Sequence, residues 1–191
     1  MKRRSSAMFA AALLFSVSCG SKVSLPIATS LGNLTKIEKR DKVNTNKEPV
    51  TPKAGEVVYV LTFDAHKEHE VKNIAAPELI SLTGALSDAS EITFTNFTVS
   101  MTPGLGSVLN MPLVDESGKE FGPAFFGNAQ ADGTITNAGV HFNGKVTGKD
   151  GKPWVTTGKL DFPSNNVAVV YVVPENAKLS LKDGGQKHAI N

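Results

Sequence analysis

The chain has 191 residues, of which 40% are hydrophobic and 20% are charged, a composition that fits a globular protein and excludes a disordered one. Its formal net charge is +2, and three of its cations lie together in Lys2–Arg4. Without those three, 17 basic residues stand against 18 acidic residues, a net charge of −1. A nearly neutral chain has no electrostatic attraction for nucleic acid, so we expect no nucleic-acid partner.

Residues 1–18 are predicted to form a signal peptide. The basic segment Lys2–Arg4 is followed by the apolar segment Ala7–Val17 and then by small residues. This order is typical of secretory signal peptides. The apolar segment is shorter than the roughly 20 residues that a transmembrane helix requires.

The end of this segment indicates how the exported chain is held. Ser16-Val17-Ser18-Cys19 contains the only cysteine, so the exported chain cannot form an internal disulfide. The segment resembles the lipobox of bacterial lipoproteins, in which the cysteine is lipidated and becomes the first residue, although Ser16 replaces the usual leucine. The resemblance implies that acylated Cys19 holds the protein in membrane lipid. The alternative is a secreted protein that is cut nearby, in which Cys19 has no role.

The residue after the cysteine indicates which membrane would hold the protein. Gly20 is not the aspartate that favours retention at the inner membrane of enteric bacteria. By the same resemblance, the outer membrane is the favoured location.

Residues 19–54 are predicted to be the lipidated cysteine and a flexible linker. From Gly20 to about Ala54 the chain carries Ser, Thr, Asn, Lys and Pro without sustained periodicity. The segment Asp41–Pro52 in particular is not expected to bury much apolar surface. A flexible chain of this length spans on the order of 30 Å, which suits a spacer between a lipid anchor and a folded domain.

Residues 55–191 are predicted to be the folded domain, and its first half mixes strands with at most one helix. Gly55–Phe63 is the first clear strand. Asn73–Leu86 is predicted to contain a short helix that begins near Pro77, because the first turn of a helix tolerates proline. Glu91–Met101 alternates until Asn96, where the change of phase indicates a bulge or two abutting strands.

Turn-forming residues separate the predicted strands in the second half of the domain. A strand in Val108–Val114 is followed by the hairpin-like turn Asp115–Phe121. Asp132-Gly133 and Asp150-Gly151 are strong hairpin signals between strand-like segments. Those segments include Ile135–Val146 and Trp154–Phe162, and we interpret Trp154 as an anchor of the core.

The most apolar β-branched segment is Val167–Val173, which proline-containing turns bound on both sides. A short apolar segment between turns predicts a strand that is buried on both faces. Such a strand needs a neighbour on each side and a second layer above it. Many short strands with at most one short helix therefore predict an all-β domain, an antiparallel β-sandwich.

Three segments of the domain carry a family resemblance. Lys53–Phe63, Leu113–Pro123 and Gly158–Leu181 resemble the immunoglobulin-like domains of the telokin-like kind in bacterial lipoproteins. The resemblance implies an immunoglobulin-like sandwich that serves as an extracytoplasmic binding or structural module. It brings no catalytic residues with it.

One segment gathers side chains that can bind a metal. In Asp64–Glu70, the residues Asp64, His66, His69 and Glu70 are candidate ligands, and two histidines with carboxylates suit Zn²⁺ or Cu²⁺. Their spacing is not the His-Glu-x-x-His of a zinc hydrolase helix. The alternative interpretation is a solvated hairpin tip that is rich in charge.

Two adjacent aromatic residues are candidates for ligand binding. Phe125 and Phe126 lie next to glycines, and neighbouring residues of a strand point to opposite faces. One ring is expected in the core, and the other is a candidate exposed ring that stacks on a sugar or a partner protein. The alternative is that both rings are covered.

The sequence offers no support for nucleophilic catalysis. It has no Gly-x-Ser-x-Gly elbow, its cysteine lies in the signal region, and His141 has no evident carboxylate partner. We therefore expect no enzyme and no cofactor. The sequence predicts a membrane-anchored lipoprotein of the bacterial envelope whose sandwich binds an envelope protein or glycan. The alternative is an envelope protein that binds a metal or small ligand through Asp64–Glu70.

Overall fold

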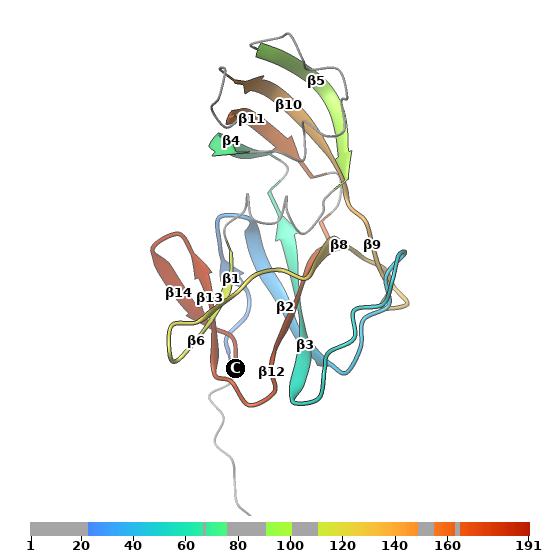
Figure 1. Cartoon of the computed structure of the whole chain (residues 1–191), viewed down its shortest axis with the longest axis vertical. Helices are drawn as coiled ribbons and strands as arrows, with labels where there is room; N and C mark the ends of the chain where they lie inside the picture. Colours follow the sequence, from blue (N-terminus) through green and yellow to red (C-terminus); the bar gives the residue numbers. More distant parts are fainter. Residues whose placement is uncertain (1–22, 67, 76–90, 101–110, 149–154, 163–164) are drawn as a thin grey trace, which may run out of the picture.

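The computed structural model describes residues 23–66, 68–75, 91–100, 111–148, 155–162 and 165–191. Within these residues the regular structure is entirely β, and every strand pair is antiparallel (Figure 1). None of the described segments forms a helix that is long and apolar enough to span a bilayer. The strands are β1 (Ile27–Ala28), β2 (Gly32–Arg40), β3 (Glu56–Ala65), β4 (Glu68–Ala75), β5 (Glu91–Ser100), β6 (Leu113–Asp115), β7 (Glu120–Phe121), β8 (Phe125–Ala129), β9 (Ile135–Thr136), β10 (Gly139–Thr147), β11 (Val155–Asp161), β12 (Val167–Pro174), β13 (Leu179–Asp183) and β14 (Gln186–Ala189).

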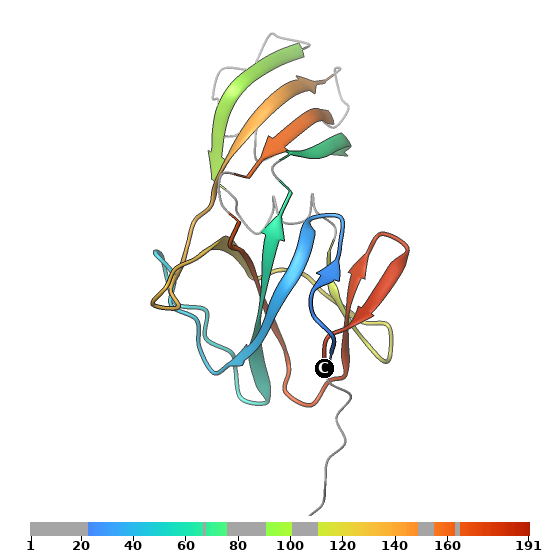
Figure 2. The ribbon, with the colours of Figure 1, turned by 180° about the vertical axis from the view of Figure 1, so that it is seen from behind.

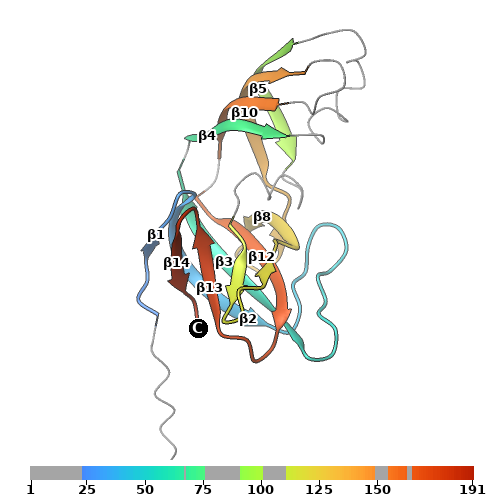
Figure 3. The same ribbon diagram turned by 60° about the vertical axis from the view of Figure 1, so that its left-hand side comes forward.

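The strands form three sheets. The central sheet has the order β1-β2-β3-β12-β8-β9, the small sheet β14-β13-β6-β7, and the distal sheet β4-β11-β10-β5. The small sheet lies beside the central sheet, and the distal sheet forms the other end of the molecule (Figures 1 and 3).

The predicted antiparallel β-sandwich is confirmed. The helix that we expected near Pro77 lies outside the described residues, and 73–75 end a strand.

The central sheet is organised around β12. This strand pairs with β3 along its whole length and with β8 over its first half, so it has a neighbour on each side, as predicted. Val169, Tyr171 and Val173 join the core cluster that includes the small sheet. Ala168 and Val170 join a second cluster on the opposite face. Because successive residues point to opposite faces, one apolar strand supplies both clusters.

A buried hydroxyl connects β12 to the chain that enters β6. Tyr171 is completely buried, and its hydroxyl donates a hydrogen bond of 2.6 Å to the carbonyl of Met111. Burial raises the pKa of Tyr171, so the phenol stays protonated. The bond satisfies a polar group that would otherwise be costly to bury.

The prediction of a flexible linker over 19–54 is wrong for its larger part. Residues 32–40 form β2, which pairs with β3 from Gly32–Ala65 to Arg40–Val58. Leu31 and Leu34 are completely buried in the core. The sequence did not predict this strand because β2 contains many polar and charged residues, and its few apolar residues are isolated from one another.

The segment between β2 and β3 is also part of the fold, although we expected it to bury little. Val43 is completely buried, and it exchanges two backbone hydrogen bonds of 3.0 and 2.9 Å with Val50. Both residues belong to the second core cluster, together with Ile135. Thus 41–55, which we call the β2–β3 loop, covers the face of the central sheet that the small sheet leaves open.

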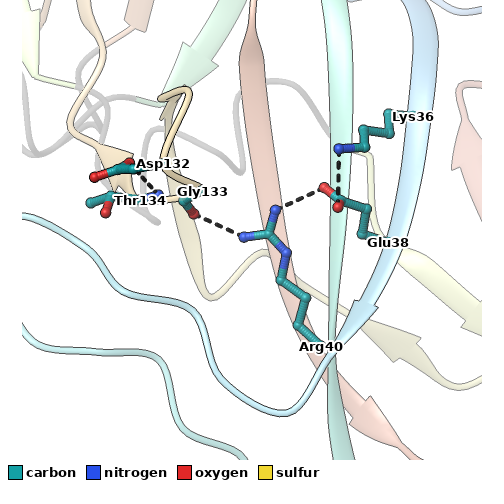
Figure 4. A network of polar contacts seen from close by, with 6 residues as sticks. All are labelled: Lys36, Glu38, Arg40, Asp132, Gly133 and Thr134. Carbon is teal, nitrogen blue, oxygen red and sulfur yellow. Dashed lines mark hydrogen bonds and ion pairs between the residues drawn. The ribbon is translucent and has the colours of Figure 1, made fainter.

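An ion-pair network joins β2 to the turn between β8 and β9 (Figure 4). Glu38 accepts from Lys36 at 3.0 Å and from Arg40 at 2.8 Å, and Arg40 donates to the carbonyl of Gly133 at 2.9 Å. Partial burial raises the pKa of Glu38, but the hydrogen bonds from Lys36 and Arg40 outweigh it and hold the pKa below its ordinary 4.5. The carboxylate is therefore the stable form in the folded chain.

The predicted turns are confirmed where the structure describes them. Gly118, in the turn between β6 and β7, and Gly133, between β8 and β9, have φ of +86° and +83°, a left-handed conformation that favours glycine. Asp115 accepts from the backbone of Ser117 and Lys119 at 2.9 and 3.0 Å. Asp150-Gly151 lies outside the described residues, although the strands on either side of it, β10 and β11, do pair.

We predict that Glu38→Gln lowers the free energy of unfolding by about 0.5–1 kcal/mol at neutral pH. The folded-state pKa of Glu38 is depressed, so its contribution is fully present above the unfolded value and is lost as pH falls through the folded value. The difference between wild type and variant should therefore shrink as pH falls below 4.5. Urea unfolding from pH 7 to pH 3 measures it.

Glu175→Gln is the matched control, because this carboxylate makes a longer ion pair of 3.7 Å with Lys39 and is 56% exposed. Its effect at neutral pH should be smaller than that of Glu38→Gln. A difference for Glu38→Gln that stays constant down to pH 3 would contradict the assignment.

Candidate interaction surface

The distal sheet has an apolar inner face and a polar outer face. On β10, Val140, Phe142 and Val146 are buried, while Asn143 and Lys145 between them are exposed. This alternation is the period of two that a strand imposes. The inner face belongs to the main core, and the outer face is open to solvent.

Aromatic packing and two glycines hold the inner face. The Phe94 ring lies 5.1 Å from the Phe97 ring and 5.8 Å from the Phe142 ring, both in tilted geometry. Gly144 and Gly158 are cross-strand partners beside Phe142. A Cβ on Gly144 would lie 2.4 Å from the carbonyl oxygen of Thr157 and 2.7 Å from the Phe142 ring. The two strands can approach this closely only with glycine there.

The predicted irregularity at Asn96 is a β-bulge. Phe97 pairs with Phe142 and Phe94 with Gly144, so two residues of β5 oppose the single residue Asn143. Asn96 has φ of +50°, and its backbone N–H donates to Oδ1 of Asn143 at 2.6 Å. Because of the extra residue, Phe94 before the bulge and Phe97 after it both point to the inner face. This explains why the alternation of apolar residues changes phase at Asn96.

The cross-strand register arranges the outer face in rows. One row is Thr98–His141–Asp161–Glu68, the next is Asn143–Lys159–Glu70, and a third is Thr93–Lys145–Thr157. A last row brings Glu91, Thr147 and the partly buried Val155 together. We call this set the outer face, and its members are Glu68, Glu70, Glu91, Thr93, Thr98, His141, Asn143, Lys145, Thr147, Val155, Thr157, Lys159 and Asp161.

Both lysines of the outer face are paired with carboxylates. Lys145 lies 2.8 Å from Glu91, and Lys159 lies 2.7 Å from Glu68. The hydrogen bond and charge of Glu68 raise the pKa of Lys159, and the charge of Glu70 adds to this effect. All these side chains are largely exposed, so the pairs stabilise the fold little. Their effect is to neutralise the two cations and fix them on the face.

His141 lies among hydroxyl and carboxylate groups, but they do not form a catalytic triad. Its Nδ1 lies 3.3 Å from the hydroxyl of Thr98, and Asp161 is its cross-strand partner. Within the described residues, no hydrogen bond or ion pair joins His141 to Asp161. Without an orienting carboxylate, this histidine lacks the arrangement that activates a nucleophile.

The metal-ligand candidates are split between two sheets. Asp64 is the last residue but one of β3 in the central sheet, and both it and His66 are exposed. By contrast, His69 and Glu70 lie on β4 in the distal sheet. Among the described residues, no three His, Cys, Asp or Glu side chains are grouped so as to hold a metal ion. The hairpin tip that we considered is wrong too, because β3 and β4 do not pair with each other.

The two aromatic candidates lie in the core. Phe125 and Phe126 are both buried, at 8% and 1% exposure, in the clusters on opposite faces of the central sheet. Neither ring is therefore available for stacking on a ligand. Cys19 and Trp154 lie outside the described residues.

Sequence reasoning missed the outer face as a unit. It named His141 and Glu70 in separate segments, but Asp161, Lys159 and the threonines carried no recognisable signal. Only the pairing of β4, β11, β10 and β5 brings them together. Two of the three pairings, β4 with β11 and β5 with β10, join strands that are far apart in the sequence. The alternation of Thr and apolar residues in β5 was the one local indication of a polar face.

The chain matches no protein-family model, and neither the curated proteins nor the solved structures contain a detectable match.

We predict that Gly144→Ala destabilises the protein by about 1–3 kcal/mol, because the new Cβ meets backbone atoms that cannot move independently. Gly139→Ala on the same strand is the control, since its Cβ would lie 3.4 Å from Cγ2 of Thr98, an ordinary contact. Thermal unfolding of the two variants gives the comparison. Equal melting temperatures would show that β10 and β11 are not in the close contact described.

Proposed function

We propose that the chain is a non-enzymatic, lipid-anchored protein of the bacterial envelope that binds an envelope component through the outer face of its distal sheet. One observation carries the proposal. The outer face is a solvent-exposed array of polar and charged side chains at the end of the molecule opposite the small sheet and the described amino terminus (Figures 1 and 2).

The amino-terminal sequence supports the anchor. Ser16-Val17-Ser18-Cys19 resembles a lipobox, and Gly20 favours the outer membrane. Because β1 begins at Ile27, residues 20–26 separate Cys19 from the first strand that the structure describes. The covalent length of that segment limits the separation to about 28 Å, and a flexible chain would average about 15 Å. The anchored domain would therefore stay close to the lipid.

The arrangement of the sheets supports the choice of binding surface. The central sheet runs between the region where the chain enters and the distal sheet, and β3 leads directly toward β4 (Figure 1). A domain held by the preceding segment would present the outer face away from its anchor. Acyl chains hold such an anchor durably, because each buried CH₂ contributes about 0.8 kcal/mol.

The anchor predicts the behaviour of Cys19→Ser. Wild type should incorporate palmitate and partition into the detergent phase, and the variant should lose both properties. Its folded domain should unfold at the wild-type temperature, because Cys19 precedes the first described strand. Ser21→Ala is the control and should still be labelled. A wild-type protein that is freely soluble and unlabelled would rule out the anchor.

The binding surface predicts a site-specific crosslink in intact envelopes. A photo-reactive amino acid at Thr157, on the outer face, should give a covalent adduct with an envelope component. The same group at Lys187, which is also exposed and lies on β14 of the small sheet, should give none. Adducts of equal yield at both positions, or none at Thr157, would reject the outer face as the binding surface.

A further inference from the structure

We infer that two copies of this chain associate through β5, whose outer edge pairs antiparallel with the same edge of the second copy about a two-fold axis. The inference goes beyond the proposed function. It concerns the edge of the distal sheet and does not depend on what the outer face binds.

The strand β5 is an edge strand that carries few of the features that prevent pairing. Among the described strands it pairs only with β10, so its other side has no strand partner there (Figure 1). Proteins commonly place lysine, other charges or proline on such edges to block association. Glu91 is the one charged residue of β5, which has neither lysine nor proline. By contrast β4, the opposite edge of the same sheet, carries Glu68, Glu70 and Lys72.

The sequence of β5 is nearly palindromic, which points to a second copy as the partner. From its two ends toward its centre, similar residues match as the pairs Ile92/Val99, Thr93/Thr98 and Phe94/Phe97. In an antiparallel pair of identical strands centred between residues 95 and 96, each residue lies opposite its match. A two-fold axis requires this self-complementarity. Aromatic, β-branched and threonine pairs are also favourable cross-strand neighbours.

The bulge at Asn96 makes the palindrome compatible with a sheet. Residues that lie opposite each other must point to the same face, yet positions 94 and 97 of a regular strand would point to opposite faces. Because the bulge adds one residue, Phe94 and Phe97 both lie on the inner face, and Thr93 and Thr98 are both exposed. Although a bulge commonly discourages edge pairing, this one lies at the centre of the palindrome and therefore at the same place in both copies.

The apolar side chains of the inner face are less completely buried at β5 than at its neighbour. Val140 and Phe142 of β10 are completely buried, whereas Phe94 is 8% exposed and Ile92 and Phe97 are only partly buried. In the inferred pair, Phe94 of one copy lies opposite Phe97 of the other, so the remaining apolar surface at this edge is covered. The two distal sheets then join into one, with both outer faces on the same side.

Disulfide crosslinking of the full chain in intact envelopes tests the register. Thr93 of one copy should oppose Thr98 of the other, so Thr93→Cys with Thr98→Cys should give covalent dimers on mild oxidation. Within one copy these positions are roughly 16 Å apart, too far for a disulfide. Glu91→Cys with Thr98→Cys is the matched control. It places the thiols on a diagonal about 7–8 Å apart and should crosslink about tenfold more slowly. Wild type measures any dimer that forms through Cys19.

Sedimentation equilibrium of the full chain in detergent tests the association itself. Thr95→Lys places a lysine from each copy beside the two-fold axis, where like charges repel, so the dissociation constant of the dimer should rise about tenfold or more. Thr157→Lys adds the same charge on β11, two strands away from β5, and should change it less than about twofold. Both threonines are exposed, so both variants should keep the wild-type melting temperature.

Faster crosslinking in the inferred register, together with association that Thr95→Lys loses and Thr157→Lys retains, supports the inference. A chain that is monomeric at every concentration, equal crosslinking of the two double variants, or association that Thr95→Lys retains overturns it. The proposed function would stand in each of these cases, because the adduct at Thr157 tests it separately.

Discussion

The structure depends on a central strand that is apolar on both faces. Val167–Val173 cannot be solvated on either side, so each face of the central sheet must be covered. The small sheet covers one face through residues such as Leu113, Leu179 and Leu181. The β2–β3 loop covers the other with Val43 and Val50. Burial of each such side chain contributes about 1.5–3 kcal/mol, enough to recruit a segment that is otherwise polar.

This requirement determines where the folded domain begins. The strand β2 and the loop after it are needed to complete the central sheet and its cover, so they are part of the domain. The ion-pair network of Glu38 and Arg40 joins β2 to the turn at Gly133.

Much of the fold could be predicted from local patterns. The apolar segments of β12 and β3, the bulge at Asn96 and the turn at Gly133 each have a cause within a few residues. What could not be predicted is the role of isolated apolar residues such as Val43, because their burial depends on partners that are distant in the chain.

The outer face likewise could not be predicted from local sequence patterns. Individual polar residues on β10 and β11 have no local signal, and they become a surface only through the register of four strands. The exposed aromatic ring that we considered was instead buried, because both faces of β8 meet a core cluster. A glycine pair that lets two strands approach, Gly144 and Gly158, likewise has no meaning until their pairing is known.

The central claim is that the folded domain includes β2 and the β2–β3 loop. Amide hydrogen exchange in the intact chain tests it most directly. The amides of Val43 and Val50, which bond each other's carbonyls, and those that pair β2 with β3 should be protected to a similar degree as β12. Exchange of these amides at the rate of an unstructured peptide, with β12 still protected, would contradict the account.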